Sequence, residues 1–195
     1  MLREVLKAWV FAGCISFAIT GALAQQVVHA FGGIVSEVNP RARTITVAPG
    51  IRPQKQNTFK DIAISKSPVL LDKKVRDDTV PVDTVKEQGT YVIVYYFSDG
   101  TAMTALALRN LGRGPFTEAV GTVVRFEGRE HSILIRDKSG AVQSFKISPD
   151  TIAESSNGVV EGFKFEPEKG DLVRITVAEA NGSAAALFID GCFVD

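Results

Sequence analysis

Two blocks of this sequence recur in the same order, and this internal repeat constrains the fold more than any other feature. Residues 33–47 align without a gap on residues 121–135, at an offset of 88. Each block starts at a glycine, and apolar positions coincide, as at Ile45 and Ile133. Self-similarity at a fixed offset indicates a duplicated structural unit.

A second pair of blocks follows in each half of the chain. Residues 89–94 align on residues 170–175 at an offset of 81, so the two halves differ in length between their blocks. An Asp-Gly or Asn-Gly pair follows each block and precedes an apolar run, which is typical of a β-hairpin. We therefore predict two copies of one small domain, over residues 25–110 and 117–195, joined by a Gly- and Pro-containing linker at 111–116.

Each copy is predicted to hold about five strands and little helix. The second copy shows the pattern best, because Val, Ile, Phe and Thr fill the apolar segments and Gly, Asn, Asp and Pro separate them. Its expected strands are 118–126, 131–137, 142–148, 170–178 and 184–190, with a further short strand within 158–165. Gly33 and Gly121 fall in the first strand of each copy, where a small closed barrel needs a bend.

These blocks resemble small exported bacterial domains of unknown function that form an OB-like barrel. Gly33, Val35, Val38, Ile45 and Val47 carry the resemblance in the first copy. The second copy carries it at Gly121, Val123, Phe126, Ile133, Ile135, Gly170, Asp171 and Val173. The resemblance implies an all-β fold with two tandem five-stranded OB-like barrels and an exported location. Because its motifs are apolar, it implies no activity.

The first copy is also reminiscent of a related group of exported small barrels that bind copper through His, Met and Trp side chains. Soft copper sites need sulfur ligands together with imidazole. Beyond the first 24 residues the chain offers only Met103, Cys192, His29 and His131, without metal-ligand spacing. We therefore expect no metal and no other cofactor.

The first 24 residues have the layout of a secretory signal, expected to be helical. Arg3 and Lys7 precede an uncharged apolar stretch from Ala8 to Leu23, and small residues end it, which predicts cleavage after Ala24. A retained anchor is the first alternative, although 16 residues are short for a membrane span of about 30 Å. Lipid attachment at Cys14 is the second. The favoured location is the periplasm or the outside of the cell, with no membrane span after cleavage.

Charge and cysteine content narrow the expected partners. Of 22 basic and 22 acidic residues, two basic and one acidic lie in the signal segment, so the cleaved chain carries a net charge of −1. This balance disfavours a nucleic-acid partner. Only Cys192 remains after cleavage, which excludes an intramolecular disulfide and leaves hydrophobic burial to hold the fold.

The segment Tyr91–Phe97 is apolar on both faces, whereas a strand buried on one face alternates. The second copy does alternate, with Arg174 and Thr176 aligned on Ile93 and Tyr95. Something must therefore cover the second face of this strand: the other copy, the 48–88 segment, another protomer, or a ligand or partner. In the last case Tyr91, Ile93, Tyr95 and Phe97 would form a docking surface.

Catalytic motifs are absent from the sequence: there is no phosphate-binding loop, no nucleophile elbow and no metal-type Cys/His cluster. Acidic residues gather at 77–78 and 166–171, as expected for solvated loops. We therefore expect a non-catalytic exported binding or accessory module for an unknown protein or small ligand. One alternative is an OB-like binder of oligosaccharide or nucleic acid. The other is an enzyme whose carboxylate site is assembled from distant residues.

Overall fold

The computed structural model describes residues 27–50, 56–61, 79–80, 85, 87–98, 100, 102–128, 130–180 and 183–191. The expected signal segment, its cleavage position at Ala24, and the cysteines Cys14 and Cys192 lie outside these residues. Among the described residues, no helix has the length and apolar character needed to cross a membrane.

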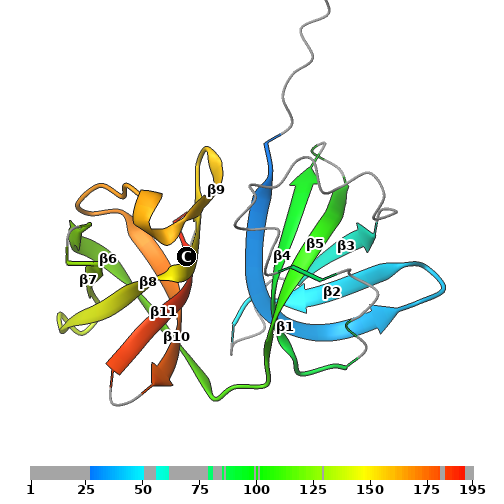
Figure 1. Cartoon of the computed structure of the whole chain (residues 1–195), viewed down its shortest axis with the longest axis horizontal. Helices are drawn as coiled ribbons and strands as arrows, with labels where there is room; N and C mark the ends of the chain where they lie inside the picture. The colour runs from blue at the N-terminus through cyan, green and yellow to red at the C-terminus, as the bar shows by residue number, and fades with distance from the viewer. Residues whose placement is uncertain are drawn as a thin grey trace, which may run out of the picture.

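The first half of the chain forms a closed five-stranded barrel (Figure 1). The strand order around the barrel is β1-β2-β3-β5-β4, and β4 pairs with β1 to close it. All neighbours are antiparallel except β3 and β5, which are parallel. The strands are β1 (His29–Asn39), β2 (Thr44–Ala48), β3 (Asn57–Asp61), β4 (Tyr91–Ser98) and β5 (Met103–Gly112).

The second half repeats this topology. Strands β6, β7, β8, β11 and β10 follow one another around the barrel, and the parallel pair is β8 with β11. The strands are β6 (Phe116–Glu127), β7 (Ser132–Arg136), β8 (Val142–Ser155), β10 (Leu172–Ala180) and β11 (Ser183–Asp190). A hairpin strand β9 (Gly158–Glu161) and a 3-10 helix η3 (Gly162–Lys164) are added after β8. The all-β fold with two tandem five-stranded barrels is thus confirmed.

The register of the strands matches in the two barrels. Gly33 lies opposite Val92 in the first barrel, and Gly121 lies opposite Val173 in the second, which are the pairs that the offsets of 88 and 81 align. A β-bulge follows two residues after each glycine, in β1 and in β6. The longer connection between the aligned blocks belongs to the first barrel. Between β5 and β6 only residues 113–115 lie outside a strand.

Gly33 and Gly121 are required because a neighbouring strand comes too close for a side chain. A Cβ atom on Gly33 would lie 2.1 Å from the carbonyl oxygen of Ala48. On Gly121 it would lie 2.4 Å from the carbonyl oxygen of Arg136. Real Cβ atoms do not approach backbone this closely, and the backbone of a paired strand has little freedom to move away. The bend that we expected at these glycines is therefore a point of close strand packing.

The substitution Gly121→Ala should test this packing. We expect it to lower the free energy of unfolding by about 2–3 kcal/mol, because the added methyl group overpacks against backbone. Gly128→Ala is the matched control, since its Cβ would meet nothing closer than Phe126 at 3.6 Å. Urea denaturation of both variants provides the comparison, and equal midpoints would contradict the packing argument.

Candidate functional site: the joint between the barrels and the outer face of the second barrel

An apolar cluster joins the two barrels, and we call it the seam. Its members from the first barrel come from β1, β4 and β5, and those from the second come from β8 and β11. Figure 1 shows β1 on the side of the first barrel that faces the second. No member is more than 9% exposed, so the seam is shielded from solvent as the barrel interiors are. The members are Ala30, Ile93, Tyr95, Leu106, Ala107, Ile152 and Phe188.

Phe188 fits against bare backbone at the centre of the seam. A Cβ atom on Gly32 would lie 2.5 Å from Cδ1 of the Phe188 ring, so the ring occupies the space that a side chain would take. Phe188 itself is 2% exposed. The two barrels therefore meet through a specific fit of a ring onto a glycine.

The structure buries the predicted docking residues in the joint: Ile93 and Tyr95 belong to the seam, Phe97 packs against it, and Tyr91 lies outside the cluster. Tyr91, Ile93 and Tyr95 are 3%, 0% and 0% exposed, and Phe97 packs partly buried against the same cluster. The second barrel thus covers the second apolar face of β4, one of the four coverings that the sequence left open. These side chains cannot form an open docking surface, because they lie inside the joint.

Tyr91 also makes a polar contact across the joint. Its hydroxyl lies 2.5 Å from the hydroxyl of Thr176 on β10, and its ring packs edge-on against Phe116. Burial raises the pKa of Tyr91 above its ordinary value, so the phenol stays protonated and can donate this hydrogen bond. Thr176 aligns on Tyr95 in the repeat. The two copies differ at this position, and the residue of each copy contacts the other barrel.

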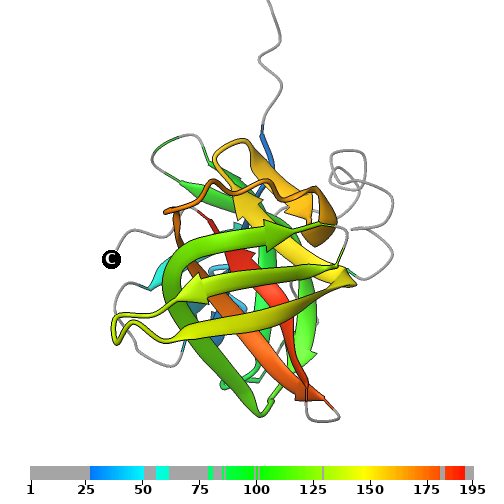
Figure 2. The ribbon, with the colours of Figure 1, turned by 90° about the vertical axis from the view of Figure 1, so that its left-hand side faces the viewer.

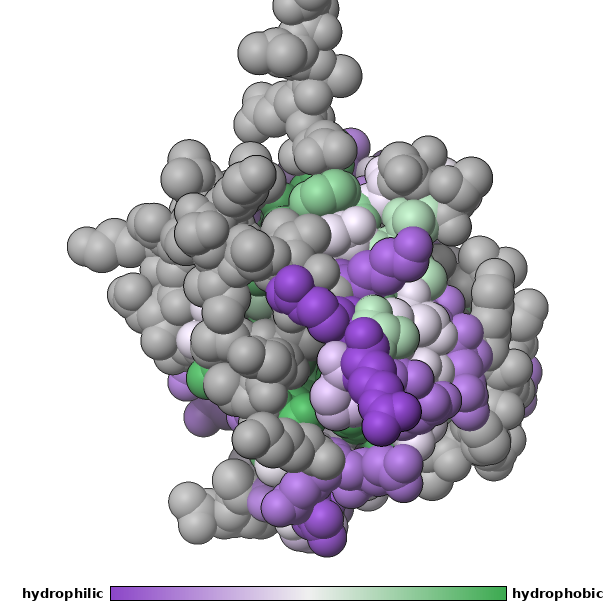
Figure 3. All heavy atoms as spheres, turned by 90° about the vertical axis from the view of Figure 1, so that its right-hand side faces the viewer, coloured by the Kyte–Doolittle hydropathy of each residue, from purple (hydrophilic) through white to green (hydrophobic). Residues whose placement is uncertain are grey.

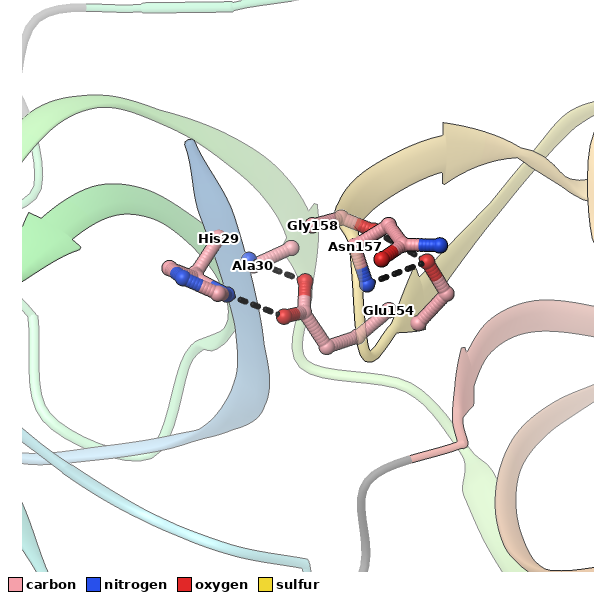
Figure 4. A network of polar contacts seen from close by, with 6 residues as sticks. His29, Ala30, Glu154, Asn157 and Gly158 are labelled. Carbon is pink, nitrogen blue, oxygen red and sulfur yellow. Dashed lines mark hydrogen bonds and ion pairs between the residues drawn. The ribbon is translucent and has the colours of Figure 1, made fainter. Parts of the chain in front are cut away.

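Glu154 ties the start of β1 to the second barrel (Figure 4). One carboxylate oxygen lies 2.6 Å from Nδ1 of His29, and the other accepts the backbone N–H of Ala30 at 2.6 Å. Next to it, the N–H of Val159 in β9 donates to the carbonyl oxygen of Val28 at 2.9 Å. Three hydrogen bonds thus fasten the residues that open the first barrel to the β8–β9 hairpin.

Burial raises the pKa of Glu154 to about 7. The hydrogen bonds from His29 and Ala30 oppose this rise, and the negative charge of Asp190 adds to it. Asp190 is the β11 residue opposite Glu154, and its carboxylate bonds Arg174 on β10 at 2.6 Å. The Arg174–Asp190 ion pair and the Glu154 carboxyl therefore lie side by side next to the seam.

A small pocket opens beside the joint, between the barrels and the linker. It has a volume of about 70 Å³. Ligand pockets commonly have several hundred Å³, so this one suits a few water molecules better than a ligand. Its lining residues are Ile34, Gly89, Tyr91, Arg113, Phe116 and Glu118. We regard the whole joint as structural.

The outer sheet face of β6, β7 and β8 points away from the joint (Figure 2). Its side chains stand in three cross-strand rows, because residues that are paired across strands lie side by side on one face. At its two ends are Arg136, paired with Val142, and Lys146, paired with Ser132. Leu134 and Ser144 form the row between them. The rows, read from β6 to β8, are Thr122–Arg136–Val142, Arg125–Leu134–Ser144 and Glu127–Ser132–Lys146.

Positive charge predominates on this outer face. Arg125 forms an ion pair with Glu127 of the same face. Arg136 and Lys146 are exposed and form no ion pair with any carboxylate in the part of the chain that the structure describes. Asp137 follows Arg136, but its carboxylate accepts hydrogen bonds from the 137–141 turn, which lower its pKa. Val142 beside Arg136 is 49% exposed, unusually high for a large apolar residue here.

A pair of rings lies at the Lys146 end of this face. The rings of His131 and Phe163 are 4.5 Å apart, with His131 exposed and Phe163 half-buried on η3. The carbonyl oxygen of His131 accepts the N–H of Ile147. His131 therefore lies beside the part of β8 that carries Lys146. His131 has a positive φ of 53°, and Arg43 has the same conformation in the first barrel, so this turn belongs to the fold.

The corresponding face of the first barrel is polar, and its exposed charges, Glu37 and Lys60, are of opposite sign. Thr46 and Thr58 share a hydrogen bond at 3.0 Å, and Ser36 donates to the carbonyl oxygen of Thr46. Figure 3 shows hydrophilic residues over much of the described part of this side of the molecule. The two barrels therefore present chemically different outer faces.

The residues considered as metal ligands lie apart. His29 bonds Glu154 at the joint, the ring of His131 packs at a tilt against that of Phe163, and Met103 packs against the core of the first barrel. The described residues contain no cluster of three or more His, Cys, Asp or Glu side chains that could hold a metal ion. Among the acidic residues at 166–171, Asp171 accepts the N–H of Glu168 within a turn.

Comparison with models of known protein families gives no match, and comparison with curated proteins gives none either. Among solved structures, one match is the crystal structure of Ag(I)CusF, with 17% sequence identity and a TM-score of 0.30. The match covers 38% of this chain and 93% of that one. The expected membership in an exported family therefore stays a prediction.

Sequence reasoning missed the residues that distinguish the outer face and the joint. Arg136 and Lys146 could have been found, because the alternation Val142, Ser144, Lys146 against Phe145 and Ile147 marks them as outward-facing. Glu154 carried no such signal. It follows Pro149 and Asp150, which indicate a loop.

Proposed function

We propose that the protein is a non-catalytic exported binding module that holds its ligand on the outer face of β6, β7 and β8. The observation that carries this proposal is the exposed row structure of that face, with Arg136 and Lys146 at its ends and Val142 exposed beside them. In OB-like barrels this face and its adjacent loops are where extended ligands bind. The aromatic strand β4 is unavailable, so the binding surface must lie elsewhere.

The joint gives this module a fixed geometry. Its apolar seam and the hydrogen bonds of Glu154 hold the two barrels by contacts from five strands. This arrangement leaves Arg136, Val142 and Lys146 of the β6–β7–β8 face exposed. A rigid scaffold that presents an open sheet face suits binding, because little side-chain or domain order has to be gained when the ligand arrives.

The proposal of a non-catalytic role rests on what the outer face contains. General acid–base chemistry needs a proton-transferring group near another reactive group or a substrate atom. Glu127, the carboxylate of this face, is engaged by Arg125 and by the hydroxyl of Ser132 at 3.2 Å. Arg136 and Lys146 can bind and orient an anion through charge-assisted hydrogen bonds.

Titration of the cleaved chain, residues 25–195, followed by amide chemical shifts tests this proposal. The probes are a neutral hexasaccharide, an acidic hexasaccharide, a twelve-residue single-stranded DNA and a basic peptide. We expect at least one probe to shift amides of β6, β7 and β8 and to be recovered chemically unchanged. If that probe is acidic, the double variant Arg136→Gln, Lys146→Gln should weaken its binding at least tenfold, since charge-assisted hydrogen bonds are lost.

Three outcomes would contradict the proposal. One is that the shifted amides lie on the first barrel or at the seam. Another is that a probe is cleaved or modified during the titration. The third is that no probe binds the wild-type chain at millimolar concentration while its spectrum shows it to be folded.

A further inference from the structure

We infer that the ligand of the β6–β7–β8 face is an acidic oligosaccharide that lies along β7 and β8, from Arg136 to the His131–Phe163 ring pair. This inference rests on the proposed function and names its ligand class. It is drawn from the spacing of the two cations, from the surface between them and from the rings at one end.

The spacing of the cations requires an extended ligand. Arg136 lies opposite Val142, and Lys146 is four residues further along β8. At about 3.4 Å per residue, the two positions are roughly 14 Å apart along the strand direction. A single carboxylate or phosphate cannot reach both. The ligand must therefore be a chain that carries at least two separated anionic groups.

The surface between the cations is neutral and mixed in polarity. Leu134, half-buried, and Ser144, exposed, form the middle row. An aliphatic side chain can cover the C–H face of a sugar ring, and a hydroxyl group can bond its hydroxyls. A chain of sugars with acidic groups at intervals meets both requirements.

The ring pair offers one stacking position at the end of this track. His131 is exposed, and its ring lies 4.5 Å from Phe163, which fixes its orientation. A sugar ring can stack there while its neighbour's acidic group meets Lys146. The turn that holds His131 is the connection between the first two strands of the barrel, a usual contact loop in OB-like folds.

These features favour oligosaccharide over single-stranded nucleic acid. A nucleic-acid track needs successive aromatic platforms for successive bases along a basic groove. The nine residues of the three rows are aliphatic, hydroxyl or charged, and the ring pair lies at one end of them. Two cations over roughly 14 Å of strand also fall short of one charge per phosphate.

Calorimetric titration with three probes tests the ligand class. They are hexagalacturonate as the acidic oligosaccharide, maltohexaose as its neutral counterpart and a twelve-residue oligothymidylate. We expect hexagalacturonate to bind at least tenfold more tightly than either of the others, with an affinity that falls as salt is added. Arg136→Gln and Lys146→Gln should each weaken it about tenfold, through loss of a charge-assisted contact. Lys60→Gln, at an exposed lysine on β3 of the first barrel, is the matched control and should leave it unchanged.

Separate outcomes distinguish this inference from the proposed function. Tighter binding of maltohexaose or of the DNA on the same face would overturn the acidic-oligosaccharide inference and leave the binding module standing. Binding of hexagalacturonate that is unaffected by both charge variants would overturn the inference as well. Lack of binding by all three probes to a folded wild-type chain would overturn the inference, and the proposed function would fall with it if the basic peptide did not bind either. His131→Ala adds a further test, because loss of the stacked ring should weaken binding severalfold without changing its salt dependence.

Discussion

Replacing Phe188 with alanine should lower the free energy of unfolding by about 3–5 kcal/mol and loosen the joint between the barrels. The ring is 2% exposed and fits against the backbone of Gly32, so its removal leaves a cavity that the flanking strands cannot fill. The cost includes the lost apolar burial and the lost contacts of the cavity lining. Thermal denaturation measures the total effect.

Amide hydrogen exchange separates a loosened joint from general destabilisation. The N–H groups of Ala30 and Val159 both donate across the joint. In Phe188→Ala they should exchange faster than amides in either barrel interior. Phe145→Ala is the matched control, because it removes the same ring from the interior of the second barrel, outside the seam. If Phe188→Ala left Ala30 and Val159 as protected as the interior amides, Phe188 would not be what holds the joint.

Changing Glu154 to glutamine should remove a pH dependence of stability. The pKa of Glu154 is raised from 4.5 to about 7 in the folded chain, so the folded state binds more protons than the unfolded state between these values. The stability that this protonation contributes is complete below pH 4.5 and is lost as the pH rises through 7. The wild-type chain should therefore be less stable at pH 8 than at pH 5, by on the order of 2–3 kcal/mol from this group.

Urea denaturation from pH 5 to pH 8 measures this effect. Glutamine can still accept the N–H of Ala30 and offer an amide N–H to His29, so Glu154→Gln should keep the joint and flatten the profile. His29→Phe is an informative comparison, because it keeps a ring beside Tyr96 and removes the donor. The hydrogen bond from His29 lowers the pKa of Glu154, so its loss should move the transition to higher pH. An unchanged slope in Glu154→Gln would assign the pH dependence to another group.

The barrels could be predicted from the sequence because duplication and alternation are local signals. The glycines and the paired offsets of 88 and 81 fix which residues face one another across β1 and β4, and the same holds for β6 and β10. The sequence also marked β4 as a strand covered on both faces. It could not choose among four coverings, since the contact of Tyr95 with the second barrel depends on how two folded units dock.

The extension of β8 shows where local reasoning stops. The expected strand ended at residue 148, before Pro149 and Asp150, but β8 runs from Val142 to Ser155. Its second part leaves β7 and pairs with β11 on one side and β9 on the other. Tertiary pairing thus overrides the turn-forming residues. Glu154 lies in this second part, so its burial and its contact with His29 could not be predicted.

The residues of the seam come from both ends of the described chain, and this separation in sequence has a consequence for folding during synthesis. β4 and β5 can close the first barrel early in synthesis, but the ring that covers their outer face comes from Phe188, near the end of the sequence. Until Phe188 has been synthesised, Ile93, Tyr95 and Leu106 form an exposed apolar patch on the incomplete chain. Surfaces of this kind recruit chaperones or cause aggregation. Chains truncated after the first barrel should therefore aggregate or bind a chaperone, although the barrel itself would be closed.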